Sequence, residues 1–171
     1  VRSQGKGTYV APQKQKQMAN DLPGLTGTCK QAGKDIRSKV LSMEYAYPTH
    51  SESKFLMIPE DEQVIEIKRL RYIDNHPIII ETLHFLKTYD FLFQEDLSGS
   101  LFEILHKHGY AVMNSNRTLE ICTASAYEAG LLEIKRNAPL LLFKDHQFGK
   151  DGKPFFVSKQ LYNTQNMVFY L

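Results

Sequence analysis

The sequence predicts an α+β fold, with short helices inserted between the strands of an antiparallel β-sheet. Two pairs of apolar segments flank the turn sequences Asp74-Asn-His-Pro77 and Lys150-Asp-Gly-Lys153, which is typical of two β-hairpins. Short stretches with helical spacing lie between these pairs, and strands joined mainly by hairpins indicate an antiparallel sheet. The four segments of the two hairpins are 63–73, 78–86, 140–148 and 155–162.

The N-terminal part of the chain differs in composition from the remainder. Residues 1–23 hold few apolar side chains, and glutamine alternates with lysine from Gln13 to Gln17. This composition is typical of an exposed linker. We therefore predict a linker or a remnant of an upstream unit at 1–23 and one domain at 24–171, beginning with a short helix at 26–32.

Two further elements are expected before the first hairpin. Residues 39–47 favour a strand, which Pro48 ends because proline cannot donate to a β-ladder. Residues 51–57 predict a helical turn whose N-cap is Ser51 or Ser53.

The second half of the chain predicts two more helices and two more strands. Residues 100–108 have apolar side chains at helical spacing, and Gly109 follows as an end signal. Residues 110–124 indicate a long strand, and 124–132 a helix. Residues 167–171 are expected to close the sheet as a short final strand.

Composition excludes several classes of protein. The 171 residues, 42% of them hydrophobic, suffice for one domain with its own core. A net charge of +2 is too small to indicate nucleic-acid binding by itself. No apolar run approaches the ~18 residues that a membrane span needs. Cys29 and Cys122 lie far apart in the sequence, so we expect buried, reduced thiols in a cytoplasmic protein.

The candidate site centres on Arg69 and Arg71. Because they are two positions apart in a strand, their side chains point to the same face, where guanidinium groups bind phosphate or carboxylate in a bidentate way. Glu81 is a single carboxylate in an otherwise apolar return strand, so it is expected to pair with an arginine or to accept bonds from ligand hydroxyls. The competing interpretation of the arginines is a solvated strand face, with Glu66 as a partner.

Ser100 begins a helix, where backbone N–H groups favour an anion. Glu103 follows three residues later, so a capping box is the competing interpretation. The spacing of His106 and His108 does not suit a metal pair, and no nucleophile stands beside the arginines. We therefore predict ligand binding with no catalytic residue, metal or cofactor.

These residues, taken in order, resemble a known family. The first ten residues are similar to the last strand and wing of the winged helix–turn–helix in GntR-type transcription regulators. The rest resembles the ligand-sensing domain of the HutC type, called UTRA, which has a chorismate-lyase-like fold. The matching segments are Gly24–Thr26, Ser38–Leu41, Ile67–Arg71, Asp74–Pro77, Glu81, Asp96–Leu101, Leu131–Leu132 and Asp151–Pro154.

The resemblance implies a binding site for a sugar phosphate. It implies that Arg69, Arg71 and Ser100 hold the phosphate, with Thr26 close to them. It also implies that Glu81 binds sugar hydroxyls and that Tyr162 completes the site.

The chain departs from the family pattern after the Asp151–Pro154 turn. Many members carry a glutamate where this chain has Phe156, and the common Tyr-Arg-x-Asp is Tyr162-Asn-Thr-Gln165 here. An aromatic ring in place of a carboxylate favours stacking on a sugar face. The phosphate half of the site is thus better supported by the sequence than the sugar half.

The resulting prediction is the effector-binding and dimerising part of a transcriptional repressor for carbohydrate uptake or catabolism genes. Its expected partners are a small anionic effector, a second copy of the chain, and operator DNA bound through an upstream winged helix; no membrane is expected. One alternative is a chorismate-lyase-like enzyme that uses Glu81 as acid or base. Another is a purely structural dimerisation module.

Overall fold

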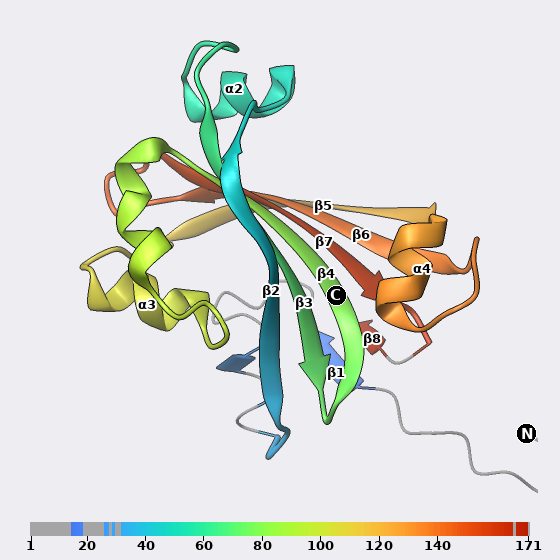
Figure 1. Ribbon diagram of the computed structural model, residues 1–171. Coiled ribbons are helices and arrows are strands. Elements are labelled where there is room, and N and C mark those ends of the chain that lie inside the picture. The colour runs from blue at the N-terminus through green and yellow to red at the C-terminus, as the bar shows by residue number, and fades with distance from the viewer. Residues whose placement is uncertain (1–14, 19–25, 28, 30–31, 166, 171) are drawn as a thin grey trace, which may run out of the picture.

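The computed structural model describes residues 15–18, 26–27, 29, 32–165 and 167–170. It confirms the α+β fold: six strands form an antiparallel sheet in the order β2-β3-β4-β7-β6-β5 (Figure 1). The strands are β1 Gln15–Met18, β2 Ile36–Ala46, β3 Val64–Ile73, β4 His76–Phe85, β5 Asn114–Thr123, β6 Pro139–Phe148, β7 Pro154–Asn163 and β8 Met167–Tyr170. The helices are α2 His50–Leu56, the 3-10 helix η1 Lys87–Gln94, α3 Leu101–Lys107 and α4 Ala126–Leu132.

The hairpin of β3 and β4 has the tight turn that its sequence indicates. Asp74 and Asn75 both have positive φ, 48° and 66°, as a two-residue turn of the I′ type requires. The turn pairs Ile73 with His76 and Tyr72 with Pro77, and an irregularity between Arg71 and Tyr72 then shifts the register by one residue. This shift places Arg71 opposite Ile79 and Arg69 opposite Glu81.

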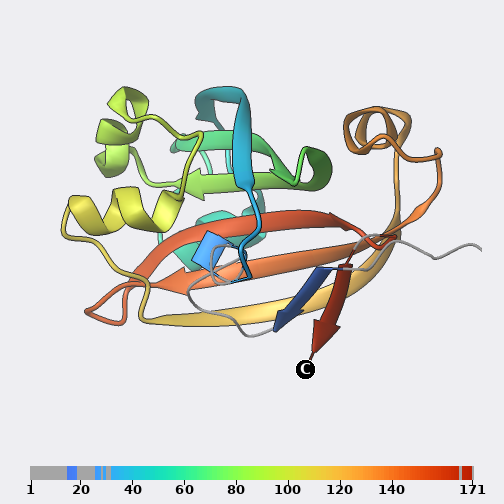
Figure 2. The same cartoon turned by 90° about the horizontal axis from the view of Figure 1, so that it is seen from below.

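Two expectations about elements are wrong: the partner of the last strand and the N-cap of α2. β8 does not close the main sheet; it pairs in parallel with β1, beside it in Figure 2. β1 therefore lies within the segment expected to be a linker, while residues 1–14 and 19–23 of that segment lie outside the described residues. The N-cap of α2 is Thr49, which forms a capping box with Glu52, and not Ser51 or Ser53.

The two faces of the sheet bury different clusters. On the face with Arg69 and Arg71, η1 and α3 place Leu92, Leu101 and Leu105 against apolar residues of β3, β4 and β7. On the opposite face, α4 packs its apolar side onto the sheet. The buried residues of this second cluster are Leu70, Ile80, Ala124, Ala129, Leu132, Leu140, Leu142 and Leu161.

Two further predictions concern the cysteines and membrane spans. Cys29 is buried, whereas Cys122 is only half-buried, and both are free thiols. Among the helices of the described residues, none is long and apolar enough to cross a membrane.

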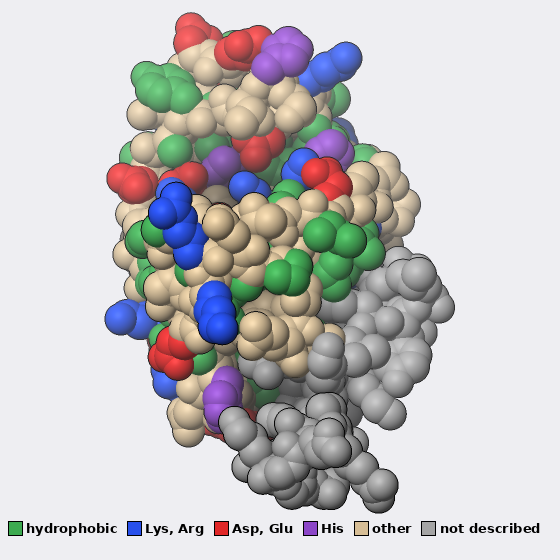
Figure 3. Space-filling view, turned by 90° about the vertical axis from the view of Figure 1, so that its right-hand side faces the viewer, with side chains coloured by type: hydrophobic (Ala, Val, Ile, Leu, Met, Phe, Trp, Pro, Cys, Tyr) green, Lys and Arg blue, Asp and Glu red, His purple; other side chains and the backbone are tan. Residues whose placement is uncertain are grey.

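An ionic cluster attaches α2 to the face of the sheet that α4 covers. The imidazole of His84 lies between two carboxylates, with Nδ1 3.1 Å from Glu52 and Nε2 3.0 Å from Glu66. Lys68 contacts the other oxygen of Glu66 at 2.6 Å. In the space-filling view, charged side chains of both signs gather with histidine below the upper part of the molecule (Figure 3).

The cluster shifts the pKa values of its members. Burial lowers the pKa of His84, but the hydrogen bonds and charges of Glu52 and Glu66 outweigh it and raise the pKa above its usual value. Burial raises the pKa of Glu52, but the contacts with His84 and Thr49 outweigh it and lower the pKa to about 2. His84 therefore joins α2 to the sheet and stays protonated to a higher pH than a free imidazole.

This cluster should make stability depend on pH. The raised pKa of His84 in the folded protein means that its contribution is complete below the unfolded value of about 6.5 and is lost as pH rises through the folded value. Replacing His84 by Gln should therefore lower the free energy of unfolding by about 1.5 kcal/mol near pH 5.5 and by clearly less near pH 9. Urea denaturation of both proteins at the two pH values tests this; an equal difference at both would contradict the assignment.

Candidate effector site

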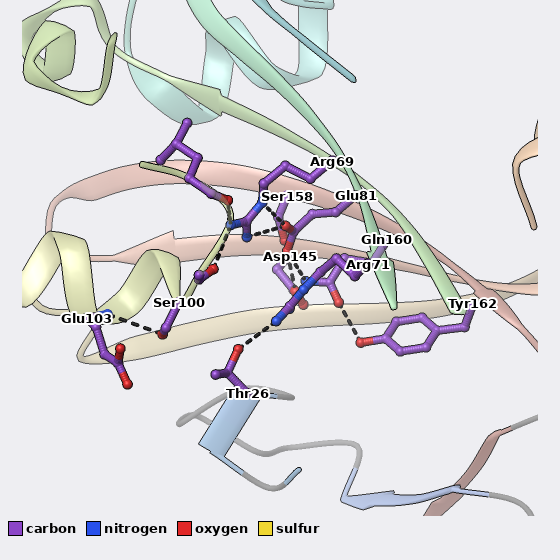
Figure 4. A network of polar contacts seen from close by, with 12 residues as sticks. Thr26, Arg69, Arg71, Glu81, Ser100, Glu103, Asp145, Ser158, Gln160 and Tyr162 are labelled. Carbon is purple, nitrogen blue, oxygen red and sulfur yellow. Dashed lines mark hydrogen bonds and ion pairs between the residues drawn. The ribbon is translucent and has the colours of Figure 1, made fainter. Parts of the chain in front are cut away.

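Arg69 is fully engaged within the protein. Its side chain is 1% exposed, and its Nε donates to Glu81 Oε2 at 2.8 Å, as does Nη2 at 2.5 Å. Its Nη1 donates to the carbonyl oxygens of Leu97 at 3.1 Å and Gly99 at 3.3 Å (Figure 4). Arg69 therefore holds the turn before α3 against β3 and β4, and its predicted part in binding phosphate stays a prediction.

Arg71 is also buried, at 7% exposed, but makes fewer hydrogen bonds to the described residues. Its Nη2 donates to the Thr26 hydroxyl at 2.6 Å, while its Nε is buried without a hydrogen-bond partner among the described residues. Burial lowers the pKa of Arg71, and the attraction of Glu81 opposes this only in part. A buried guanidinium group that is bonded only to a neutral hydroxyl favours an added anion.

Glu81 is a buried carboxylate. Burial raises its pKa, but the charges of Arg69 and Arg71 outweigh this and lower the pKa below its usual range. Its second oxygen, Oε1, lies 3.5 Å from Gln160 Nε2, and Gln160 in turn accepts a hydrogen bond of 2.7 Å from Tyr162. Glu81 and Tyr162 thus lie in one polar network, as Figure 4 shows.

Ser100 has the capping role that its sequence context indicates. Its hydroxyl accepts a hydrogen bond of 3.3 Å from the backbone N–H of Glu103, at the start of the seven-residue helix α3. The preceding turn is fixed by the Asp96 carboxylate, which accepts from Ser98 N–H at 2.9 Å. Binding of an anion by Ser100 stays a prediction.

Phe156 lies in the apolar core. It is 1% exposed, and its ring stacks on Phe85 with centroids 4.4 Å apart and packs edge-on against Phe155. The structure thus gives Phe156 a packing role, and stacking of this ring on a sugar stays a prediction.

The sequence interpretation missed a second ion pair on the same face. Asp145 in β6 is 1% exposed and binds Arg117 of β5 through both carboxylate oxygens, at 2.5 and 2.8 Å. Ser158 of β7 donates to it at 3.1 Å. A carboxylate at an inward position of an apolar strand is the signal that indicates such a pair, as it did for Glu81.

Among the described residues of this polar row, positive and negative side chains are unequal in number. Three arginines, Arg69, Arg71 and Arg117, face two carboxylates, Glu81 and Asp145. Each carboxylate binds one arginine closely, so the excess positive charge resides at Arg71. One negative charge on a bound anion would therefore balance the charges of the described residues in this row.

The same residues do not suggest chemistry on a bound molecule. Glu81 stays ionised between arginines, which makes it a weak base and no acid near neutral pH. Burial raises the pKa of the Cys29 thiol near Arg71, so this thiol is not an activated nucleophile. In the described part of the chain, no group of three His, Cys, Asp or Glu side chains is placed to hold a metal ion.

Removal of Arg69 and removal of Arg71 should change the free energy of unfolding by very different amounts. Arg69→Ala leaves Glu81 buried without its partner and should lower the free energy of unfolding by about 3–5 kcal/mol. Arg71→Met removes a buried charge that is hydrogen-bonded to no carboxylate among the described residues, so stability should change by less than about 1 kcal/mol. Urea denaturation of both variants tests this, and equal losses would contradict the division between the two arginines.

Comparison with known proteins agrees with this fold. A family model described as the UTRA domain matches residues 31–167. The HTH-type transcriptional repressor NagR of Bacillus subtilis (strain 168) is 24% identical over 170 residues, 98% of this chain and 70% of that protein. The probable fructoselysine utilization operon transcriptional repressor of Shigella flexneri is 27% identical over 164 residues, 93% of this chain and 66% of that protein. The chain thus spans about two thirds of the length of these relatives.

Solved structures share the architecture. The effector domain of PhnF from Mycobacterium smegmatis superimposes with a TM-score of 0.85 at 19% identity, over 91% of this chain and 96% of that one. The possible transcriptional regulator YydK from Bacillus subtilis gives a TM-score of 0.74 at 24% identity, over 100% of this chain and 75% of that one. Because the family model matches well over half of the sequence, the chain belongs to the UTRA domain family.

Proposed function

We propose that this chain is the effector-binding part of a GntR-family transcriptional repressor of the HutC type, and that its effector is a small anion, most simply a phosphorylated sugar. The observation that carries the proposal is Arg71, a buried guanidinium group with an unpartnered Nε among the described residues. One relative is named for a fructoselysine utilization operon, which supports a role in controlling carbohydrate genes. The protein would act in the cytoplasm, with operator DNA bound by a winged helix upstream of the UTRA domain.

The proposed regulation is a linkage between effector and DNA. A ligand that binds one arrangement of the protein more tightly than another shifts the populations of the two. The hydrogen bond from Arg71 to Thr26 supports such a link, because Thr26 belongs to the segment that joins β1 to the sheet. An anion that draws Arg71 toward itself would change this contact.

Catalysis is less well supported than binding. A chorismate-lyase-like reaction assigns proton transfer to Glu81, whose lowered pKa makes it unsuitable as acid or base. The proposal therefore treats the site as a sensor.

Thermal unfolding with sugars and their phosphates tests the effector class. A ligand present at about 100 times its dissociation constant should add roughly 2.7 kcal/mol of stability. We expect hexose phosphates to raise the melting temperature, neutral parent sugars to have no effect, and Arg71→Met to abolish the response. A response to neutral sugars alone would overturn the anion assignment.

We also propose that two copies of the chain associate through β5. This ten-residue strand is an edge of the six-stranded sheet, and its unpaired backbone groups can extend the ladder into a second copy. Its apolar side chains are uncommonly exposed, Leu119 at 43% and Ile121 at 79%, with Tyr127 of α4 at 66%.

Charge at this edge should disrupt the association. Ile121→Glu should weaken the dimer at least about tenfold, because a charged edge side chain opposes strand pairing. Val40→Glu is the matched control, since Val40 is an exposed β-branched residue on β2, the other edge strand. Sedimentation velocity over a concentration series measures both; a dimer that resists Ile121→Glu or is equally weakened by Val40→Glu would refute the interface.

A further inference from the structure

Ser38 is a buried serine whose hydroxyl finds no hydrogen-bond partner in the part of the chain that the structure describes. It lies in β2, it is 6% exposed, and its Oγ has no hydrogen-bond partner among the described residues. In the β2–β3 ladder it stands directly opposite Arg71. Directly opposed side chains of an antiparallel pair leave the sheet on the same face and lie side by side.

Ser38 and Arg71 each have a buried polar atom without a hydrogen-bond partner among the described residues. Ser38 Oγ and Arg71 Nε are two of only a few buried side-chain atoms that lack a partner in the described part of the chain. Buried polar atoms in folded proteins are nearly always paired, so two unpaired atoms on adjacent residues suggest one missing partner for both. A guanidinium group only donates hydrogen bonds, so that partner must be an acceptor.

The backbone of Ser38 connects this position to the other half of the predicted site. Its N–H donates to the carbonyl oxygen of Ser98 at 2.8 Å, in the turn that leads to Ser100. Ser38 therefore lies between Arg71 and that turn, on the strand next to both arginines.

The hydrogen-bond donors next to Arg71 and Ser38 come from different elements of the chain. Arg71 Nε belongs to β3 and Ser38 Oγ to β2, while the Thr26 hydroxyl, which accepts from Arg71, keeps its own proton to donate. A carboxylate has two acceptor oxygens, whereas a phosphate monoester offers three terminal ones.

We propose that Ser38 is an effector-binding residue that, with Arg71 and Thr26, holds a tetrahedral oxyanion, the phosphate of the ligand, in preference to a carboxylate. This inference rests on the proposed function, because it names the chemical group that the anion site takes. It adds a residue from β2 to a site for which the sequence indicated residues of other elements.

The test is Ser38→Ala, with Ser115→Ala as its matched control. Ser115 in β5 also carries a buried hydroxyl without a partner among the described residues, but it lies in the strand at the opposite edge of the sheet. Neither substitution should lower the melting temperature of the unliganded chain, since each removes a hydroxyl that makes no hydrogen bond to the described residues. Inorganic phosphate is the probe, in calorimetric titration and thermal unfolding, with sulfate and acetate alongside.

We expect Ser38→Ala to raise the dissociation constant for phosphate about tenfold or more, and Ser115→Ala to leave it unchanged. Sulfate should follow phosphate, and acetate should bind more weakly to the unsubstituted chain. An unchanged phosphate affinity in Ser38→Ala, or a fall in the melting temperature of that unliganded variant, would overturn the role of Ser38. Acetate binding as tight as phosphate would overturn the preference for a tetrahedral oxyanion.

The outcomes also separate this inference from the proposed function. If the unsubstituted chain responds to phosphate and Arg71→Met does not, while Ser38→Ala responds normally, only the role of Ser38 is wrong. If the unsubstituted chain responds to neither phosphate nor hexose phosphates, the anion-sensing function itself is wrong, and this inference with it.

Discussion

The buried ion pair of Arg69 and Glu81 is the interaction on which the site depends. It joins neighbouring positions of β3 and β4, and Arg69 uses its remaining nitrogen to hold the carbonyl groups of the turn before α3. Glu81 is bonded to Arg69, whereas Arg71, two residues further along the same face, donates to Thr26 and is attracted to Glu81 only by charge. The Arg69–Glu81 ion pair therefore positions the turn next to the candidate site. It also leaves Arg71 without a hydrogen-bonded carboxylate among the described residues.

Two residues of the same type in one strand thus have different tasks. The burial of Arg69 is offset by a carboxylate and two carbonyl oxygens, while Arg71 has one hydroxyl as its hydrogen-bond partner among the described residues. A buried charge with a close partner of opposite sign can hold parts of the structure together. A buried charge without such a partner lowers the stability of the folded protein, and charges of this kind often mark functional sites. Binding of an anion would offset this loss of stability most directly.

The local parts of this architecture could be predicted from sequence, and the long-range parts could not. Alternation in β3 placed the arginines on one face, and the turn residues Asp74 and Asn75 indicated the hairpin. The irregularity between Arg71 and Tyr72, which brings Arg69 opposite Glu81, has no signal in the sequence pattern. The pairing of β8 with β1, and of Ser38 with Arg71, joins segments far apart in the chain, for which local spacing carries no signal. The N-cap of α2 was misassigned because several hydroxyl residues precede the helix, and only geometry shows which one bonds to Glu52.

Thr26 connects Arg71 to the N-terminal part of the chain. Its hydroxyl is the one described hydrogen-bond partner of the Arg71 side chain, and the chain N-terminal to it leads back to β1, which pairs with β8 beside the main sheet. An anion at Arg71 must either share the guanidinium group with Thr26 or bind both of them. In the first case the proposed anion would weaken the Arg71–Thr26 contact, and in the second it would strengthen it. The same few hydrogen bonds would therefore decide both the binding of the proposed effector and the direction of the response.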